Sequence, residues 1–167
     1  MLLSAQSIRA RCLAGALVIE PFCERTVQCG LTYGLGPASY DVRLDQDLLL
    51  APRWFPGSFR LASIMEYLQI PLDLRARVCD KSSQARSAIG MYNTVVDPGW
   101  RGFLTLEIRN DGYWFRFLKR GTPIAMIEFE LLDEPTELPY SGKYQDQPPH
   151  PVSAIHESQP VQRDLSE

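Results

Sequence analysis

Residues 81–110, KSSQARSAIGMYNTVVDPGWRGFLTLEIRN, are the stretch from which the fold can be worked out. Near its end Leu104, Leu106 and Ile108 alternate with a mostly polar set that includes Thr105 and Glu107. Successive side chains of a β-strand point to opposite faces, so this pattern predicts a strand with one aliphatic and one mostly polar face. The stretch also gathers many polar functional groups between apolar segments, which indicates a functional site.

The sequence on both sides repeats the strand pattern. Residues 39–44 alternate apolar and polar side chains and predict a strand with one buried face. Short apolar pieces follow between residues 59 and 79, and residues 114–132 predict two more strands with a turn at 120–123. Short strands at this spacing, without helical periodicity between them, predict a mainly β fold, a β-sandwich or jelly roll rather than a βαβ fold.

A short N-terminal helix is the only substantial helix that the sequence predicts. Ser4 is expected to cap it and Gly15 to end it. Its apolar face is predicted to consist of Ile8, Cys12 and Leu13.

Two segments lack an apolar period. Residues 24–37 are rich in glycine and are predicted to form a turn-rich loop. Residues 135–167 carry six of the thirteen prolines and few large aliphatic residues, so they cannot build a core of their own. We therefore expect a domain at 1–138 and a C-terminal arm at 139–167 that lies over another surface.

Composition limits the class of protein. A chain of 167 residues, 45% apolar and 22% charged, has the size of one globular domain. Its net charge of −3 argues against a nucleic-acid polymer or a membrane surface as partner, so an anionic ligand must be met by a local cationic cluster. No apolar run suits a membrane span and no signal-peptide layout is present, so we expect a cytoplasmic protein.

The cysteines and histidines argue against zinc. The four cysteines have no CxxC pairing and are interpreted as reduced, mostly buried thiols. Both histidines, His150 and His156, lie in the proline-rich tail, which disfavours a histidine-ligated zinc or a histidine-dependent triad.

Each polar group of the central stretch allows two interpretations. Glu107 is by default a solvent-facing strand carboxylate, but it could be a general base held on a rigid strand. Residues 97–99, Asp-Pro-Gly, are by default a type I or II turn. Residues 81–86 could be a plain strand end, yet two hydroxyls beside two basic side chains suit a phosphate chain.

Six segments together resemble the dCTP deaminase branch of the trimeric dUTPase-like family. In chain order they are LSAQSIRA, PASYDVRL, the E-x-x-x-I-P-x-D-L pattern at 66–74, KSSQAR, VDPGWRGFLTLEIRN and PYSGKYQDQ. The resemblance covers almost the whole chain. It implies a distorted jelly-roll subunit in a homotrimer, with three active sites at subunit interfaces and a dCTP- or dUTP-type nucleotide as substrate.

The resemblance also implies roles at the phosphate end. Lys81, Ser82, Ser83 and Arg86 fall on the family's phosphate and active-site motif, with Ser82 and Arg86 among the catalytic residues. The family usually has arginine where this chain has Lys81. Lysine keeps the positive charge but lacks the planar guanidinium group of arginine and its fixed set of N–H donors.

Further roles follow for the sugar, the base and the arm. Asp97 falls on the aspartate that receives the deoxyribose 3′-hydroxyl and that helps activate water in dUTP-hydrolysing relatives. Trp100 falls where an aromatic ring lies under the sugar, and Glu107 falls on the deaminase glutamate. The C-terminal motif that folds over the triphosphate is matched by Tyr140, Lys143 and Gln147.

The implied reaction is deamination of dCTP to dUTP and ammonia without zinc. Glu107 would take a proton from a water that attacks C4 of cytosine, and Mg²⁺ would be held by the triphosphate rather than directly by the protein. Residues 87–96, expected to form the hairpin that recognises the base, are shorter than the family pattern and have valines at 95 and 96. Three alternatives therefore stay open: hydrolysis of dUTP or another dNTP, both reactions in sequence, or a nucleotide-binding regulator without turnover.

Overall fold

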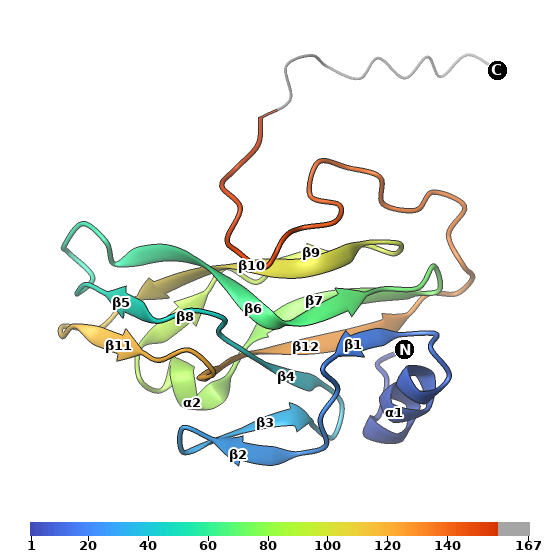
Figure 1. Ribbon diagram of the computed structural model, residues 1–167, viewed down its shortest axis with the longest axis horizontal. Coiled ribbons are helices and arrows are strands. Elements are labelled where there is room, and N and C mark those ends of the chain that lie inside the picture. Colours follow the sequence, from blue (N-terminus) through green and yellow to red (C-terminus); the bar gives the residue numbers. More distant parts are fainter. Residues whose placement is uncertain (157–167) are drawn as a thin grey trace.

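The computed structural model describes residues 1–156, which form two antiparallel β-sheets packed face to face, a two-stranded ribbon and an N-terminal helix (Figure 1). The predicted mainly β sandwich is confirmed. All strand pairs within the sheets are antiparallel. This arrangement lets each strand turn an apolar face to the other sheet.

The first sheet has four strands in the order β1-β6-β10-β8. Its strands are β1 (Val18–Glu20), β6 (Phe59–Gln69), β8 (Ile89–Met91) and β10 (Arg101–Asn110). Strand β10 pairs with β6 over almost its full length, and the register shifts once, between Phe103 and Thr105.

The second sheet has six strands in the order β2-β3-β4-β12-β7-β9, and β5 pairs with β11 in the separate ribbon. The strands of the sheet are β2 (Thr26–Gln28), β3 (Leu31–Leu35), β4 (Tyr40–Arg43), β7 (Leu74–Asp80), β9 (Val95–Val96) and β12 (Pro123–Leu131). The ribbon consists of β5 (Leu48–Leu50) and β11 (Arg116–Leu118).

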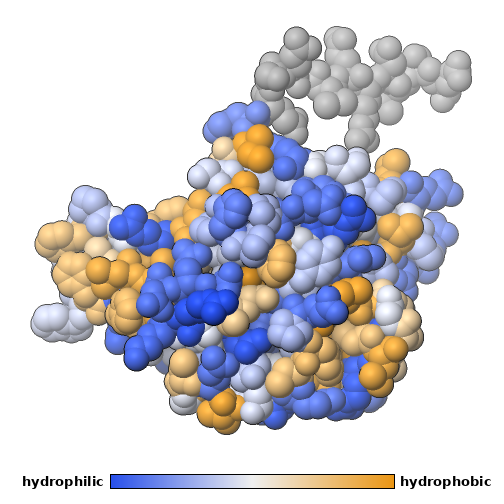
Figure 2. Space-filling view, in the orientation of Figure 1, coloured by the Kyte–Doolittle hydropathy of each residue, from blue (hydrophilic) through white to orange (hydrophobic). Residues whose placement is uncertain are grey.

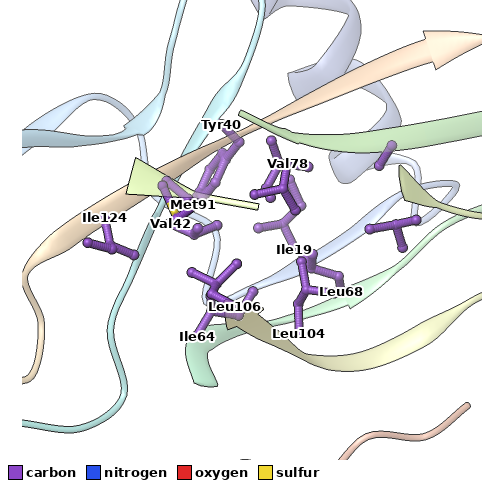
Figure 3. Packing of buried hydrophobic residues seen from close by; sticks show 14 of the residues in the cluster. Ile19, Tyr40, Val42, Ile64, Leu68, Val78, Met91, Leu104, Leu106 and Ile124 are labelled. Carbon is purple, nitrogen blue, oxygen red and sulfur yellow. The ribbon is translucent and has the colours of Figure 1, made fainter. Parts of the chain in front are cut away.

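The aliphatic face of β10 forms one wall of the core. Leu104 and Leu106 are buried beside Ile64 and Leu68 of β6 (Figure 3). This confirms the alternation predicted for β10 and leaves its other face, which carries Thr105 and Glu107, for a site.

Strand β4 differs from the prediction that only one of its faces is buried. All four of its residues are buried, because its charged side chains have partners. Nε of Arg43 lies 2.7 Å from Oε1 of Glu66, and Oδ2 of Asp41 lies 2.5 Å from Nζ of Lys81. Pairing offsets part of the cost of removing these charges from water, so the second face can be buried as well.

The helix α1 (Ala5–Leu13) confirms the predicted position of the N-terminal helix. Gly15, at φ +69°, ends it in the left-handed conformation typical of a helix C-terminus. Leu13 is 81% exposed, so its predicted place on the buried face of Ile8 is wrong. Ser4 occupies the cap position but makes no capping hydrogen bond; its hydroxyl contacts that of Ser7.

The prediction of a loop at 24–37 is wrong, because this segment contains the β2–β3 hairpin. Cys29 and Gly30 connect the two strands, both with positive φ. Two such residues form the tight turn that matches strand twist, but Cys-Gly is not the Asn-Gly or Asp-Gly signal that identifies such turns.

Two further segments, residues 114–132 and 87–96, do not form the hairpins that were expected of them. Both strands predicted in residues 114–132 are present, but β11 pairs with β5 and β12 pairs with β4 and β7. Residues 87–96 likewise cross between the sheets, since β8 pairs with β10 and β9 pairs with β7. The segment expected to be a base-recognising hairpin is therefore a crossover.

The chain after β12 passes over the edge of the sandwich next to β9 and β10 (Figure 1). An isolated β-bridge between Gly102 and Gln147 pairs this part of the chain with β10. The predicted arm runs to residue 167, and positions 157–167 lie outside the described residues.

The four cysteines are free thiols, as predicted, but they are not mostly buried: three are half-buried and Cys29 is exposed. Within residues 1–156, no helix has the length and apolar character needed to cross a membrane.

Candidate active site

A cavity of about 460 Å³ lies on the polar face of β6 and β10, between strand β9 and the arm. This volume is within the range of pockets that hold small organic ligands. Its lining comes from four parts of the chain: Phe59, Leu61, Thr94, Val95, Val96, Asp97, Trp100, Leu104, Thr105, Glu107, Tyr140, Tyr144, Gln147, Val152 and Ala154.

Glu107 lies on the floor of this cavity. Its neighbours Leu106 and Ile108 are buried in the core, so the alternation of β10 points the Glu107 side chain the other way. The carboxylate is half-buried, and among residues 1–156 it has a hydrogen bond to its own backbone N–H but no partner from another residue. Burial raises the pKa of Glu107 because it penalises the charged form. A half-buried carboxylate that no other residue binds is available to exchange protons with a ligand or a water, whereas the default interpretation of a solvent-facing residue does not fit its position.

The turn at residues 97–100 forms one side of the cavity. The predicted turn is confirmed: N–H of Trp100 donates to the carbonyl oxygen of Asp97 at 3.2 Å, and Gly99 has φ +85°, as a type II turn requires. Asp97 is exposed to solvent while lining the cavity. The indole ring of Trp100 is buried, and its Nε1–H donates to the carbonyl oxygen of Tyr144 at 2.7 Å.

The arm covers the cavity at the register shift of β10. N–H of Phe103 donates to the carbonyl oxygen of Gln147 at 3.0 Å, and N–H of Thr105 donates to Oε1 of Gln147 at 3.1 Å. Beyond that point N–H of Val152 donates to Oγ1 of Thr105 at 3.0 Å. Gly102, at φ +141°, permits this approach, since a Cβ there would lie 2.5 Å from the Gln147 nitrogen. The irregularity in the strand thus supplies the donors that hold the arm.

The phosphate motif predicted at residues 81–86 lies away from the cavity. Val96, which lines the cavity, pairs with Ala76, and Lys81 follows five residues later along β7, about 16 Å at the rise of a strand. Lys81 is buried, and its ammonium group contacts Asp41 and Thr32. The rest of the motif forms or follows the single turn α2 (Ser82–Ala85).

The predicted site residues therefore divide into two groups. The cavity brings together Asp97, Trp100, Glu107, Tyr140 and Gln147. Outside its lining are Lys81, Ser82, Ser83, Arg86 and Lys143. Ser82, Arg86 and Lys143 are exposed, and the ammonium of Lys143 lies over the ring of Tyr144.

Three polar residues of the cavity were not predicted as site residues from the sequence: Thr94, Thr105 and Tyr144. Thr105 shares the face of Glu107, so the alternation of β10 was a signal for it. Tyr144 hydrogen-bonds through its hydroxyl to N–H of Ile155, and its position could be found only once the arm was placed.

None of the residues that line the cavity is a lysine, arginine or histidine. In the described part of the chain, no group of three or more His, Cys, Asp or Glu side chains is arranged to hold a metal ion. The cavity itself offers two carboxylates, Asp97 and Glu107. An anionic ligand here needs cations from outside the lining.

Comparison with known proteins identifies the family. A family model described as dCTP deaminase-like matches residues 54–132. A dCTP deaminase of Acidobacterium capsulatum is 32% identical over 169 residues, which cover 84% of this chain and 91% of that relative. This chain belongs to the dCTP deaminase family. The resemblance found in the sequence motifs is thereby confirmed.

The name of another relative in the dCTP deaminase family also states a product. A "dCTP deaminase, dUMP-forming" of Methanobrevibacter smithii is 42% identical over 87 residues, 51% of this chain and 45% of the relative.

Solved structures agree on the fold of the dCTP deaminase family. The 2′-deoxycytidine 5′-triphosphate deaminase of Agrobacterium tumefaciens superposes with a TM-score of 0.57 at 21% identity, over 77% of this chain and 47% of that one. This chain therefore spans about half the length of that protein. EIAV dUTPase superposes with a TM-score of 0.55 at 16% identity, over 76% of this chain and 98% of that one.

Proposed function

We propose that this protein deaminates dCTP to dUTP and ammonia in the cytoplasm, as part of pyrimidine deoxynucleotide metabolism. The observation that carries the proposal is the Glu107 carboxylate, which is half-buried in a ligand-sized cavity and is bound by no other residue among residues 1–156. The names of the family's relatives supply the substrate.

In the proposed reaction Glu107 moves the proton. Its carboxylate takes a proton from a water molecule whose oxygen attacks C4 of the cytosine ring. The protonated carboxyl then gives this proton to the 4-amino group, the C4–N bond breaks and ammonia leaves. The remaining hydroxyl proton moves from the C4 oxygen to N3, and this oxygen becomes the carbonyl of uracil. A raised pKa suits a group that must both accept and return a proton near neutral pH.

No zinc takes part in this proposal. Zinc deaminases hold their metal with histidine and cysteine ligands. The described residues contain no cluster of that kind, so the protein's own carboxylate is assigned to water activation.

The triphosphate requires cations that the cavity lining lacks. We assign it to Ser82, Ser83 and Arg86 of another copy of the chain in a homotrimer, together with Lys143 of the arm. Lys81 is already bound to Asp41, so its charge would act mainly by holding the motif in place.

Magnesium fits this site only through the nucleotide. The cavity presents Asp97 and Glu107 but no three-ligand group, so the triphosphate oxygens would supply the metal's main ligands. When bound, the ion would balance part of the phosphate charge.

A second candidate function adds hydrolysis of the dUTP product. Asp97 lines the same cavity as Glu107, is exposed to solvent, and is a second carboxylate able to activate a water. The relative whose name includes "dUMP-forming" supports this alternative.

Product analysis on dCTP and magnesium tests these proposals together. Ammonia and dUTP in equal amounts, without pyrophosphate, is the expected result for a deaminase alone. Ammonia with dUMP and pyrophosphate would support the bifunctional enzyme. Pyrophosphate from dUTP without ammonia from dCTP would refute deamination, and binding without any product would favour a regulator.

A further inference from the structure

Thr105 is a buried threonine in the wall of the cavity, two residues before Glu107 on the polar face of β10. It is only 6% exposed, and the arm bonds across it. Its backbone N–H donates to Oε1 of Gln147, and its hydroxyl oxygen accepts from N–H of Val152. Figure 2 shows a largely hydrophilic outer surface where Figure 1 places the arm. The hydroxyl is therefore shielded from solvent while it still lines the cavity.

The hydroxyl of Thr105 carries a proton for which the described chain offers no acceptor. A threonine hydroxyl can donate one hydrogen bond and accept two. The oxygen accepts from Val152, but the hydroxyl donates to no group among residues 1–156. Ser63, which lies opposite Thr105 on β6, directs its own hydroxyl to the carbonyl oxygen of Ile64 at 3.4 Å. A buried donor without an acceptor costs free energy, so this hydroxyl indicates that a ligand supplies the acceptor.

The positions of Thr105 and Glu107 match two sites on one pyrimidine ring. Side chains two residues apart on a strand point to the same face and lie about 7 Å from one another. A water bound to Glu107 takes up about 2.8 Å of that distance. On a ring whose C4 faces this water, the C2 carbonyl is two ring positions away and accepts hydrogen bonds. This carbonyl is therefore within reach of the Thr105 hydroxyl.

The base suits this hydroxyl better than the triphosphate does. The proposed reaction brings C4 of the base to Glu107, on the same face of the strand. The triphosphate needs cations, and none of the residues that line the cavity is a lysine, arginine or histidine. Cytosine and uracil share the C2 carbonyl, so a donor at Thr105 would hold substrate and product alike without distinguishing them.

We infer that the Thr105 hydroxyl donates a hydrogen bond to the C2 carbonyl of the pyrimidine base, an inference that rests on the proposed function. Thr105 is then a specificity residue that fixes the ring with C4 towards Glu107. The arm takes part in this contact as well. N–H of Val152 occupies one side of the hydroxyl oxygen and so limits the directions in which the O–H can point.

A nucleotide with sulfur in place of the C2 oxygen, 2-thio-dCTP, tests the contact, because sulfur is a weak hydrogen-bond acceptor. The wild type is expected to release ammonia from 2-thio-dCTP with a kcat/KM about 10-fold below that for dCTP, the usual contribution of one buried hydrogen bond. Thr105→Val keeps the shape of the side chain and removes the hydroxyl, so the ratio should fall towards one. Thr105→Ser keeps the hydroxyl and should retain the wild-type ratio.

Val152→Pro is the matched control for the arm. Proline has no N–H, so this variant loses the bond between the arm and Thr105 but keeps the hydroxyl. It should weaken the binding of both nucleotides by a similar factor and preserve their ratio. If Thr105→Val also preserves the ratio, Thr105 only holds the arm and the inference is overturned.

Binding separates this inference from the proposed reaction. Calorimetry on proteins that also carry Glu107→Gln measures the affinity for both nucleotides without turnover, and circular dichroism shows whether each variant is folded. A wild type that releases no ammonia would refute the reaction, while tighter binding of dCTP than of 2-thio-dCTP, by about 10-fold, would still support the contact. Equal affinities, or no binding of either nucleotide, would overturn it. This comparison needs no change at Thr105, so it decides even if Thr105→Val does not fold.

Discussion

Replacing Glu107 by glutamine gives the most direct test of the site. Glutamine keeps the size of the side chain and can still accept a hydrogen bond, but it cannot take a proton from water. General acid–base groups typically contribute a factor of about 10²–10⁴ to the rate. Ammonia release from dCTP should therefore fall by about that factor, while nucleotide affinity, measured by calorimetry, should stay near the wild-type value.

The same variant should also differ from the wild type in its free energy of unfolding. Burial raises the pKa of Glu107 above its ordinary value, so the folded state binds its proton more tightly than the unfolded state does. The resulting stabilisation is fully present below the ordinary pKa and is lost as the pH rises through the raised one. Glu107→Gln should accordingly be no less stable than the wild type at neutral pH, with a gain below about 1.4 kcal/mol per unit of pKa because solvent screens a half-exposed carboxylate.

Urea unfolding at acidic and neutral pH measures this difference, and a coupled ammonia assay measures the rate. The wild-type rate should rise with pH as Glu107 ionises. Undiminished ammonia release by the glutamine variant would remove Glu107 from the mechanism. A variant that is inactive and also strongly destabilised would show that the residue is structural.

Three further changes test a buried ion pair of the core, the contact between β10 and the arm, and the arm as a whole. Glu66→Ala leaves Arg43 as an uncompensated buried charge and should lower the free energy of unfolding by about 3–5 kcal/mol in urea titrations. Gly102→Ala places a Cβ against Gln147 at a φ that costs about 1–3 kcal/mol, so limited proteolysis should cut the arm faster and KM for dCTP should rise. Truncation after Leu138 should chiefly weaken nucleotide binding, and an unchanged affinity in calorimetry would argue against any role of the arm.

The sequence predicted the features that depend on local periodicity. The alternation of Leu104, Leu106 and Ile108 correctly placed the face of β10 that carries Glu107, because a strand has only two faces. The type II turn before Trp100 was equally local, since Asp-Pro-Gly suits few other conformations.

Pairings between distant segments could not be predicted in this way. Residues 81–86 and Glu107 lie close in sequence, yet β7 carries the first group to the opposite end of its sheet before β8 enters the other sheet. The burial of Asp41 and Arg43 depends on Lys81 and Glu66, which local patterns do not connect to β4. The place of Tyr144 in the cavity depends on an arm that has no periodicity at all.

The register of β10 against β6 determines what a folding error in this strand would do to the site. A slip of one residue would turn Glu107 into the core and Leu106 out into the cavity, and the core could not accept that exchange. A slip that misplaces Glu107 would therefore also prevent the sandwich from folding. The population of chains that survives folding should be chemically uniform: a defect in this strand reduces the number of competent molecules without creating a folded class that has its carboxylate on the wrong side.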